Sequence, residues 1–204
     1  MLAWLGLGFR AHPAGIDESQ NPGEDNMLYV RRLAREKAAY TAKSFNEGIV
    51  LAADTIVELD GVTLGKPADA LDARRMLDAL RGRQHRVITA LCLIDTRDNR
   101  QVEDVCVSSV QMRNFTDAQR DAYIRSGDPL DKAGAYAIQH PEFQPVEYFH
   151  GCMASVMGLP LCHLERNLRK MMPASLPEPA VLCCKNLRYD CPIHAGVLAG
   201  KELG

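Results

Sequence analysis

The chain has 204 residues, of which 47% are hydrophobic and 25% charged, so it can bury one sizeable core or two closely packed lobes. Its formal net charge of −2 gives no general attraction to nucleic acid or to an anionic membrane. No apolar run approaches the ~20 residues of a membrane span. Seven cysteines, odd in number and unevenly spaced, are typical of a reduced cytoplasmic protein and not of a disulfide framework.

The chain opens with a short apolar segment and then a polar loop. Residues 2–5, followed by Gly6, resemble the last turn of a helix, and residues 7–10 are expected to lead into a strand. The loop at residues 14–24 (AGIDESQNPGE) then carries Glu18 directly after Asp17. Taken alone, it is an ordinary acidic loop in solvent.

Residues 25–44 are predicted to form an amphipathic helix with a lysine on its apolar face. Val30, Leu33, Ala34 and Ala38 recur at helical spacing, and Lys37 falls on the same face. Because burying an unpaired ammonium group is costly, Lys37 should either contact an anion or extend to the solvent edge. The residues alone leave both interpretations open.

The stretch from residue 47 to 95 organises the rest of the chain. A short apolar strand at residues 49–53 is expected to end on Asp54 and Thr55, and a second strand at residues 62–64 to end on Gly65-Lys66-Pro67. In open α/β sheets, ligands bind at strand ends. The positions of Asp54 and Lys66 at two such ends therefore predict that they form two walls of one cleft. The alternative for Asp54 is a structural carboxylate that caps nearby backbone groups.

The remaining elements follow from caps and periodicity. Asp69 and Thr116 are predicted to cap two helices that end at Gly82 and Gly127. Strands are expected at residues 85–94 and 101–112, joined by a hairpin at 96–100, with a loop and short strand at 143–151 and a helix at 159–172. The fold class is therefore α/β.

Three separated motifs in this order resemble one known family. AADTIV with LGKP and H-x-V-x-TAL, then YIRSGDPLDKAGAYAIQ, then GLPL are similar to the Maf family, the septum-formation-inhibitor-like nucleotide pyrophosphatases. The resemblance covers roughly residues 5–168. It implies a mixed, elongated central sheet flanked by helices, with two lobes and a nucleotide cleft between them.

The resemblance also implies an activity and a set of site residues. It implies hydrolysis of a nucleoside triphosphate to the monophosphate and pyrophosphate, with Asp54 as general base and with Asp54 and Glu18 holding Mg²⁺ or Mn²⁺. Lys37 and Lys66 would neutralise the phosphates. Threonine after the aspartate is similar to the subgroup that acts on dTTP and UTP.

Two neutral side chains and one further lysine complete the predicted site. The resemblance suggests that Thr55 and Gln139 contact the base, whereas a structural interpretation has them satisfy backbone groups. Lys132 is a further candidate for substrate binding, although an ion pair with Asp131 would also explain it.

The chain departs from the family pattern at its beginning. Family members usually begin with a strand and a loop of the type S-x-S-P-R-R, and nothing here matches that loop. We therefore expect a Maf-like domain that lacks the Ser/Arg phosphate loop. The alternative function is a non-catalytic nucleotide-binding or regulatory protein. The expected partner is a nucleoside triphosphate, with neither nucleic acid nor membrane, and a homodimer is left open.

Composition changes after residue 172, which divides the chain into a predicted Maf-like domain (1–172) and a linker with a cysteine-containing tail (173–204). Two weaker constellations compete with the main site. Cys152 could act as a nucleophile with His150 or Ser155, but free cysteine is more often core filler. A zinc site in the tail lacks a C-x2-C pair; its candidate ligands are Cys183, Cys184, Cys191 and His194.

Overall fold

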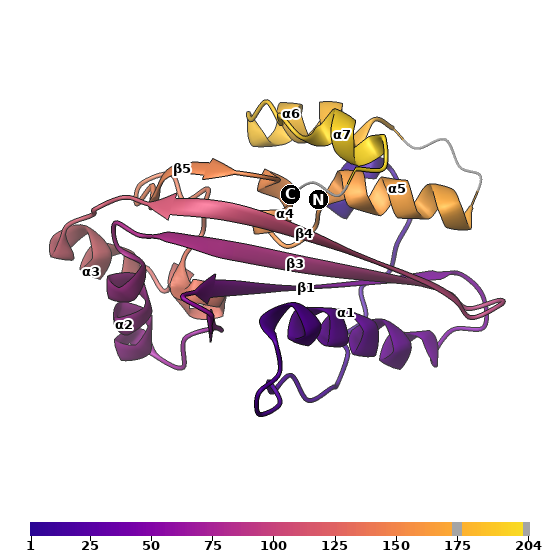
Figure 1. Cartoon of the computed structure of the whole chain (residues 1–204), viewed down its shortest axis with the longest axis horizontal. Helices are drawn as coiled ribbons and strands as arrows, with labels where there is room; N and C mark the ends of the chain where they lie inside the picture. Colours follow the sequence, from indigo (N-terminus) through magenta and orange to yellow (C-terminus); the bar gives the residue numbers. More distant parts are fainter. Residues whose placement is uncertain (173–176, 202–204) are drawn as a thin grey trace.

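A computed structural model describes residues 1–172 and 177–201, and Figure 1 shows its arrangement. The strands are β1 (Ile49–Leu59), β2 (Val62–Leu64), β3 (Gln84–Asp95), β4 (Arg100–Met112) and β5 (Val146–His150). The α-helices are α1 (Asn26–Ala42), α2 (Ala70–Leu80), α3 (Asp117–Arg125), α4 (Met153–Val156), α5 (Leu161–Met171), α6 (Pro179–Leu187) and α7 (His194–Leu198). Single 3₁₀ turns are η1 (Leu2–Leu5), η2 (Asp128–Asp131) and η3 (Ala133–Ala135).

The five strands form one sheet in the order β2-β1-β3-β4-β5, and each neighbouring pair runs antiparallel. Turn chemistry explains the connections. Asp60 and Gly61, between β1 and β2, both have positive φ (52° and 80°), as an Asp-Gly hairpin turn requires. The long β3–β4 hairpin places Gln84 opposite Gln111 and Asp95 opposite Arg100.

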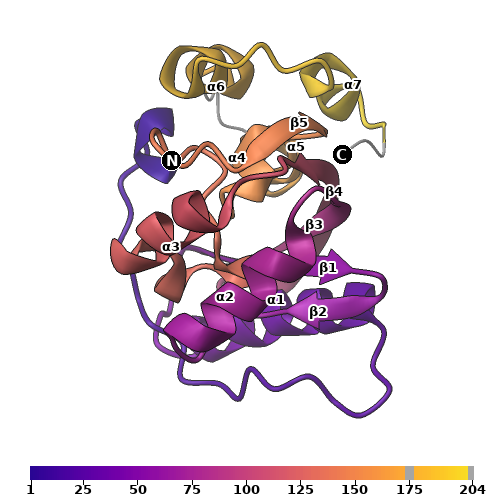
Figure 2. The ribbon, with the colours of Figure 1, turned by 90° about the vertical axis from the view of Figure 1, so that its left-hand side faces the viewer.

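Helices cover both faces of the sheet over half of its length (Figures 1 and 2). On one face α1 packs Val30, Ala34 and Ala38 against a cluster that includes Val50 and Ile56 of β1. On the other face α5 packs Leu164 and Leu168 against residues that include Leu51 of β1, while α6 and α7 lie outside α5. Successive β1 side chains therefore alternate between the α1 face and the α5 face.

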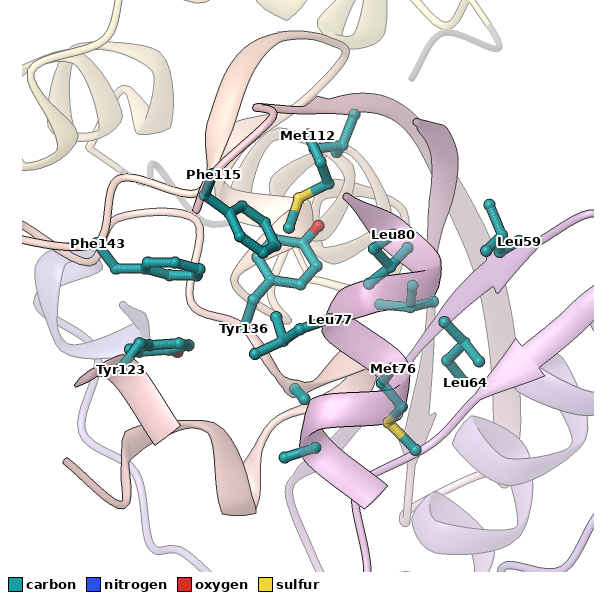
Figure 3. Packing of buried hydrophobic residues seen from close by; sticks show 14 of the residues in the cluster. Leu59, Leu64, Met76, Leu77, Leu80, Met112, Phe115, Tyr123, Tyr136 and Phe143 are labelled. Atoms are coloured by element: carbon teal, nitrogen blue, oxygen red, sulfur yellow. The ribbon is translucent and has the colours of Figure 1, made fainter. Parts of the chain in front are cut away.

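The far end of the sheet has a hydrophobic cluster of its own, shown in Figure 3. Leu77 and Leu80 of α2 are fully buried there against aromatic residues, among them Phe115. Tyr136 is buried in the same cluster, and its hydroxyl lies 2.7 Å from Nε2 of His85. This end forms one lobe, and the half held between α1 and α5 forms the other.

Most predicted elements occur close to their expected positions. Asp69 accepts a hydrogen bond from the backbone of Asp72 and caps α2, and Thr116 forms a capping box with Gln119 at the start of α3. The expected α/β class, with its elongated sheet and flanking helices, is confirmed. Of the helices in the described ranges, none is long and apolar enough to cross a membrane.

Two predictions about strands are wrong. The first strand does not end at Asp54 but continues to Leu59, because further β-branched residues follow and no turn residue appears before Asp60. The strand into which residues 7–10 are expected to lead does not form, since the first strand in the described ranges begins at Ile49. Leu7, Gly8 and Phe9 instead line a cavity together with Ile49 and Leu51 of β1, and the sheet in the described ranges contains no strand from that segment.

Candidate active site

A cavity of about 580 Å³ opens beside β1, between α1 and the η2–η3 segment. Its volume lies within the ~300–1,000 Å³ that small-molecule pockets usually have. All seven side chains predicted from sequence line this one cavity, namely Glu18, Lys37, Asp54, Thr55, Lys66, Lys132 and Gln139. The tertiary fold brings them together from five separate segments of the chain.

The cavity lies at a stretch of β1 that has only one strand neighbour. β2 pairs with β1 only from Val57 to Leu59, so within the described ranges the outer edge of β1 is unpaired from Ile49 to Ile56. Neighbouring side chains on a strand point to opposite faces. The cavity follows the open edge and is therefore lined by Asp54 on the α1 face and by Thr55 on the opposite face.

Lys37 of α1 joins two carboxylates on the α1 side of the cavity. Its Nζ lies 2.5 Å from Oδ1 of Asp54 and 2.9 Å from Oε1 of Glu18. The Asp54 side chain is only 12% exposed, whereas that of Glu18 is 54% exposed. The sequence left two interpretations of Lys37 open, contact with an anion or extension to the solvent edge. In the structure Lys37 contacts anions, namely these two carboxylates.

Burial and pairing shift the titration of this pair. Burial raises the pKa of Asp54 above its usual value of 3.8, and the Lys37 ammonium only partly offsets that effect. For Lys37, burial alone would lower the pKa, but the hydrogen bonds and charges of Asp54 and Glu18 outweigh it and raise the pKa. Asp54 is therefore a stronger base than a solvated aspartate and is held beside a cation that stays charged.

Helix α1 also holds the loop that carries Glu18. The Tyr29 hydroxyl donates a hydrogen bond of 2.6 Å to the Glu18 carbonyl oxygen. Arg32 donates to the Ser19 carbonyl oxygen at 2.9 Å and pairs with Glu24 at 2.7 Å. These contacts explain how an exposed acidic loop keeps its carboxylate next to Lys37.

Lys66 and Lys132 reach the cavity from the other lobe and differ in how far their charge is already paired. Lys66 is exposed and makes no hydrogen bond or ion pair with any described residue. Lys132 instead pairs with Asp131 at 2.7 Å and with Asp128 at 3.1 Å. The ion pair with Asp131, which is the alternative interpretation of Lys132, is therefore present. Of the two lysines, Lys66 is the one whose charge is not already paired with a carboxylate.

Thr55 and Gln139 are the neutral hydrogen-bonding side chains among the seven, and only Thr55 lies on β1. Thr55 Oγ1 lies 2.9 Å from Oγ1 of Thr89, its cross-strand partner on β3. Gly158 passes close by, because a Cβ at that position would lie 3.6 Å from Thr55 Oγ1. Gln139 is exposed at the rim.

The competing constellations are not arranged for chemistry. A hydrogen bond with Cys106, together with burial, raises the pKa of the Cys152 thiol, which disfavours the thiolate that a nucleophile needs. Ser155 is fully buried. No three His, Cys, Asp or Glu side chains in the described ranges are grouped so that they could hold a metal ion, and all seven cysteines lie in those ranges as free thiols.

Sequence reasoning missed three cavity-lining or supporting residues: Tyr29, Thr89 and Gly158. Tyr29 and Gly158 line the cavity directly, and Thr89 supports Thr55 from beneath. Two of them lie in motifs that carry the family resemblance, Thr89 in H-x-V-x-TAL and Gly158 in GLPL, whereas none of those motifs contains Tyr29.

Comparison with known proteins shows the family of the chain. The family model described as Maf-like protein matches residues 1–171. A dTTP/UTP pyrophosphatase of Anaeromyxobacter dehalogenans (strain 2CP-1 / ATCC BAA-258) is 45% identical over 181 residues, which cover 88% of this chain and 90% of the relative. Proteins of the same name from Syntrophomonas wolfei and Thermomicrobium roseum are 43% and 42% identical, covering 79% and 95% of this chain and 85% and 88% of the relatives. The chain belongs to the Maf family.

Proposed function

We propose that this protein is a nucleoside triphosphate pyrophosphatase that hydrolyses the pyrimidine nucleotides dTTP and UTP to the monophosphate and pyrophosphate. The observation that carries the proposal is the convergence of the seven predicted side chains on one cavity. The names of the relatives support the choice of dTTP and UTP.

Asp54 acts as the general base in this proposal. It removes a proton from a water molecule, whose oxygen attacks the α-phosphorus while the bond from that phosphorus to the α–β bridging oxygen breaks. Pyrophosphate leaves with the bonding electrons. The raised pKa of Asp54 suits this role, because a base works best when its pKa approaches the working pH.

The cations bind the triphosphate and stabilise the charge that develops on it. Lys66 is exposed at the cavity and makes no hydrogen bond or ion pair with any described residue, so it is available to phosphate oxygens. Lys37 holds Asp54 and Glu18 in position and can share its charge with the substrate. Lys132 contributes less, since two carboxylates already neutralise it.

The donor set fits a hard divalent cation, Mg²⁺ or Mn²⁺, bound together with the substrate. Mg²⁺ is commonly held by one or two carboxylates plus phosphate oxygens and water rather than by a cage of protein ligands. Asp54 and Glu18 are two such carboxylates, both within hydrogen-bonding distance of one ammonium group. The cation would neutralise the phosphates and activate the water.

The proposed setting is the cytoplasm, with a nucleoside triphosphate as partner. Seven free thiols are consistent with a reducing compartment. The formal net charge of −2 favours a small anion held by a local group of lysines over a long polyanion such as nucleic acid.

Product analysis tests the proposal. Incubation with UTP or dTTP and Mg²⁺ or Mn²⁺ should yield the nucleoside monophosphate and pyrophosphate in equal amounts. The diphosphate with free orthophosphate would place the cut at the wrong bond. Asp54→Asn should reduce kcat by at least about a hundredfold, since a general base contributes 10²–10⁴-fold, and should still bind nucleotide. Binding without turnover by the unaltered protein would favour the non-catalytic alternative.

A further inference from the structure

The buried hydroxyl of Thr89 limits what the hydroxyl of Thr55 can do. Thr89 is 0% exposed, and its Oγ1 lies 2.8 Å from the carbonyl oxygen of Ser155 and 2.9 Å from Oγ1 of Thr55. A carbonyl oxygen only accepts hydrogen bonds, and a threonine hydroxyl has a single proton to donate. The Thr89 proton must therefore point to Ser155.

The direction of the second hydrogen bond follows from the first. With its proton committed to Ser155, Thr89 can only accept from Thr55, so Thr55 donates its own single proton to Thr89. The reverse arrangement would leave two oxygens 2.8 Å apart with no proton between them in a buried site, which is costly. Thr55 thus presents only lone pairs to the cavity.

We infer that Thr89 is a positioning residue for base selection: it makes Thr55 a hydrogen-bond acceptor, which takes the N3–H group of uracil or thymine. The inference rests on the proposed function. In a uracil or thymine nucleotide N3–H is the only N–H of the ring, so an acceptor in the base site has one possible donor. Cytosine instead carries a lone pair at N3. That lone pair would face the lone pairs of the Thr55 hydroxyl, and the two acceptors would repel each other.

The Ser155 carbonyl also fixes the neighbouring wall of the cavity. It accepts a second hydrogen bond of 2.7 Å from the backbone N–H of Gly158, which lies next to Thr55. Both lone pairs of this carbonyl are then used. The hydrogen bonds therefore form one chain, the hydroxyl relay, from the base through Thr55 and Thr89 to the Ser155 carbonyl. Because a carbonyl oxygen can only accept, it fixes the donor and the acceptor of each bond in this chain.

Thr89→Val tests the inference because valine keeps the shape of the side chain and replaces the hydroxyl with a methyl group, which neither donates nor accepts a hydrogen bond. The Thr55 proton is then free to turn toward the cavity and to donate to N3 of cytosine. We expect the preference for UTP over CTP, measured as the ratio of kcat/KM values, to fall about tenfold, the equivalent of one hydrogen bond. Thr89→Ser retains the hydroxyl and should keep the preference.

Matched measurements separate this role from a structural one. Thr96→Val makes the same chemical change on the β3–β4 turn, away from the cavity, and should leave the ratio unchanged. Melting temperatures show whether each variant is folded. If Thr89→Val is folded and lowers both activities equally, so that the ratio stays constant, Thr89 only supports packing and the inference fails.

Binding measurements distinguish failure of the inference from failure of the proposed function. If the unaltered protein hydrolyses neither UTP nor dTTP, the proposed function fails. The ratio of Kd values for UTP and CTP, measured by calorimetry on the same variants, then tests the hydroxyl relay alone. A ratio that falls in Thr89→Val supports the relay. An unchanged ratio, or no binding of either nucleotide, overturns it.

Discussion

At the scale of single residues, Asp54 and Lys37 form a pair in which burial and charge oppose each other. Burial favours the neutral acid and raises the pKa of Asp54, while the ammonium group 2.5 Å away favours the carboxylate. Since a general base must be deprotonated, this balance determines the pH at which the site begins to work.

The pH profile of kcat/KM should therefore have an acid limb that reports Asp54. Activity falls as pH falls through the pKa of the free enzyme's base, and that pKa lies above 3.8 because burial raises it. Lys37→Met removes the hydrogen bond and the larger of the two lysine charges that lower the pKa of Asp54, the other being that of Lys66. We expect the midpoint of the acid limb to move to higher pH in this variant, as measured by initial rates across a pH series.

A lysine elsewhere on the same segment provides the control. Lys43 is exposed at the C-terminal end of α1 and does not line the cavity. Lys43→Met should leave the acid limb where it is. If the limb also stays in place in Lys37→Met, the titrating group is not Asp54, and Glu18 becomes the next candidate for the base.

At the scale of elements, the two loops that bring lysines from the second lobe are joined at Gly134. Its backbone N–H donates a 3.0 Å hydrogen bond to the carbonyl oxygen of Gly65, next to Lys66. Gly134 has φ of +67°, and a Cβ there would lie 3.0 Å from the side chain of Val57. The position needs glycine both for its backbone conformation and for the close approach.

Gly134→Ala should lower stability and weaken triphosphate binding together. The left-handed conformation costs a non-glycine residue about 1–3 kcal/mol, and displacement of the segment moves Lys66 and Lys132 away from the substrate. We expect a lower melting temperature and a higher KM for UTP.

Gly127 offers a matched control for this change. It also has positive φ, +77°, but a Cβ there would meet nothing within 4 Å. Gly127→Ala should therefore lower the melting temperature while leaving KM near its original value. Equal KM values in the two variants would mean that the Gly134 contact does not position the lysines.

At the scale of the whole molecule, the tail packs against the domain that carries the site. Ala180 of α6 and Val197 of α7 are buried in a small cluster with Cys162 of α5. Arg166 donates to the carbonyl oxygens of Val197 and Lys201, at 3.3 and 2.9 Å. The boundary predicted at 172–173 adjoins residues outside the described ranges, so the linker itself stays a prediction.

A chain shortened at position 172 should keep its chemistry and lose stability. None of the tail's described residues lines the cavity. We therefore expect kcat/KM for UTP to change less than about threefold, which is less than the loss of one typical hydrogen bond to the substrate would cause. Exposure of the α5 surface should lower the melting temperature by more than about 4 °C, since each kcal/mol corresponds to 2–4 °C in a protein of this size. A folded but inactive shortened chain would contradict this.

Local sequence signals were sufficient for most helices and strands of the domain, although the first strand runs past its predicted end. Caps at Asp69 and Thr116, helical spacing around Lys37, the apolar run of β3 and the alternation along β4 depend on neighbours a few residues apart. These local interactions do not depend on how the rest of the chain folds. Family resemblance then selected the seven cavity residues, although their roles stay predictions.

Tertiary structure alone decided how those residues face one another. The sequence suggested that Asp54 and Thr55 stand at a strand end, whereas they lie inside a strand whose outer edge is open, on opposite faces. The partners of Lys37, the hydroxyl relay through Thr89 and the contact of Gly134 with Gly65 all join residues far apart in the chain. Such contacts depend on strand register and on helix placement. Both are set by the burial of apolar side chains over the whole core, so no short stretch of sequence indicates them.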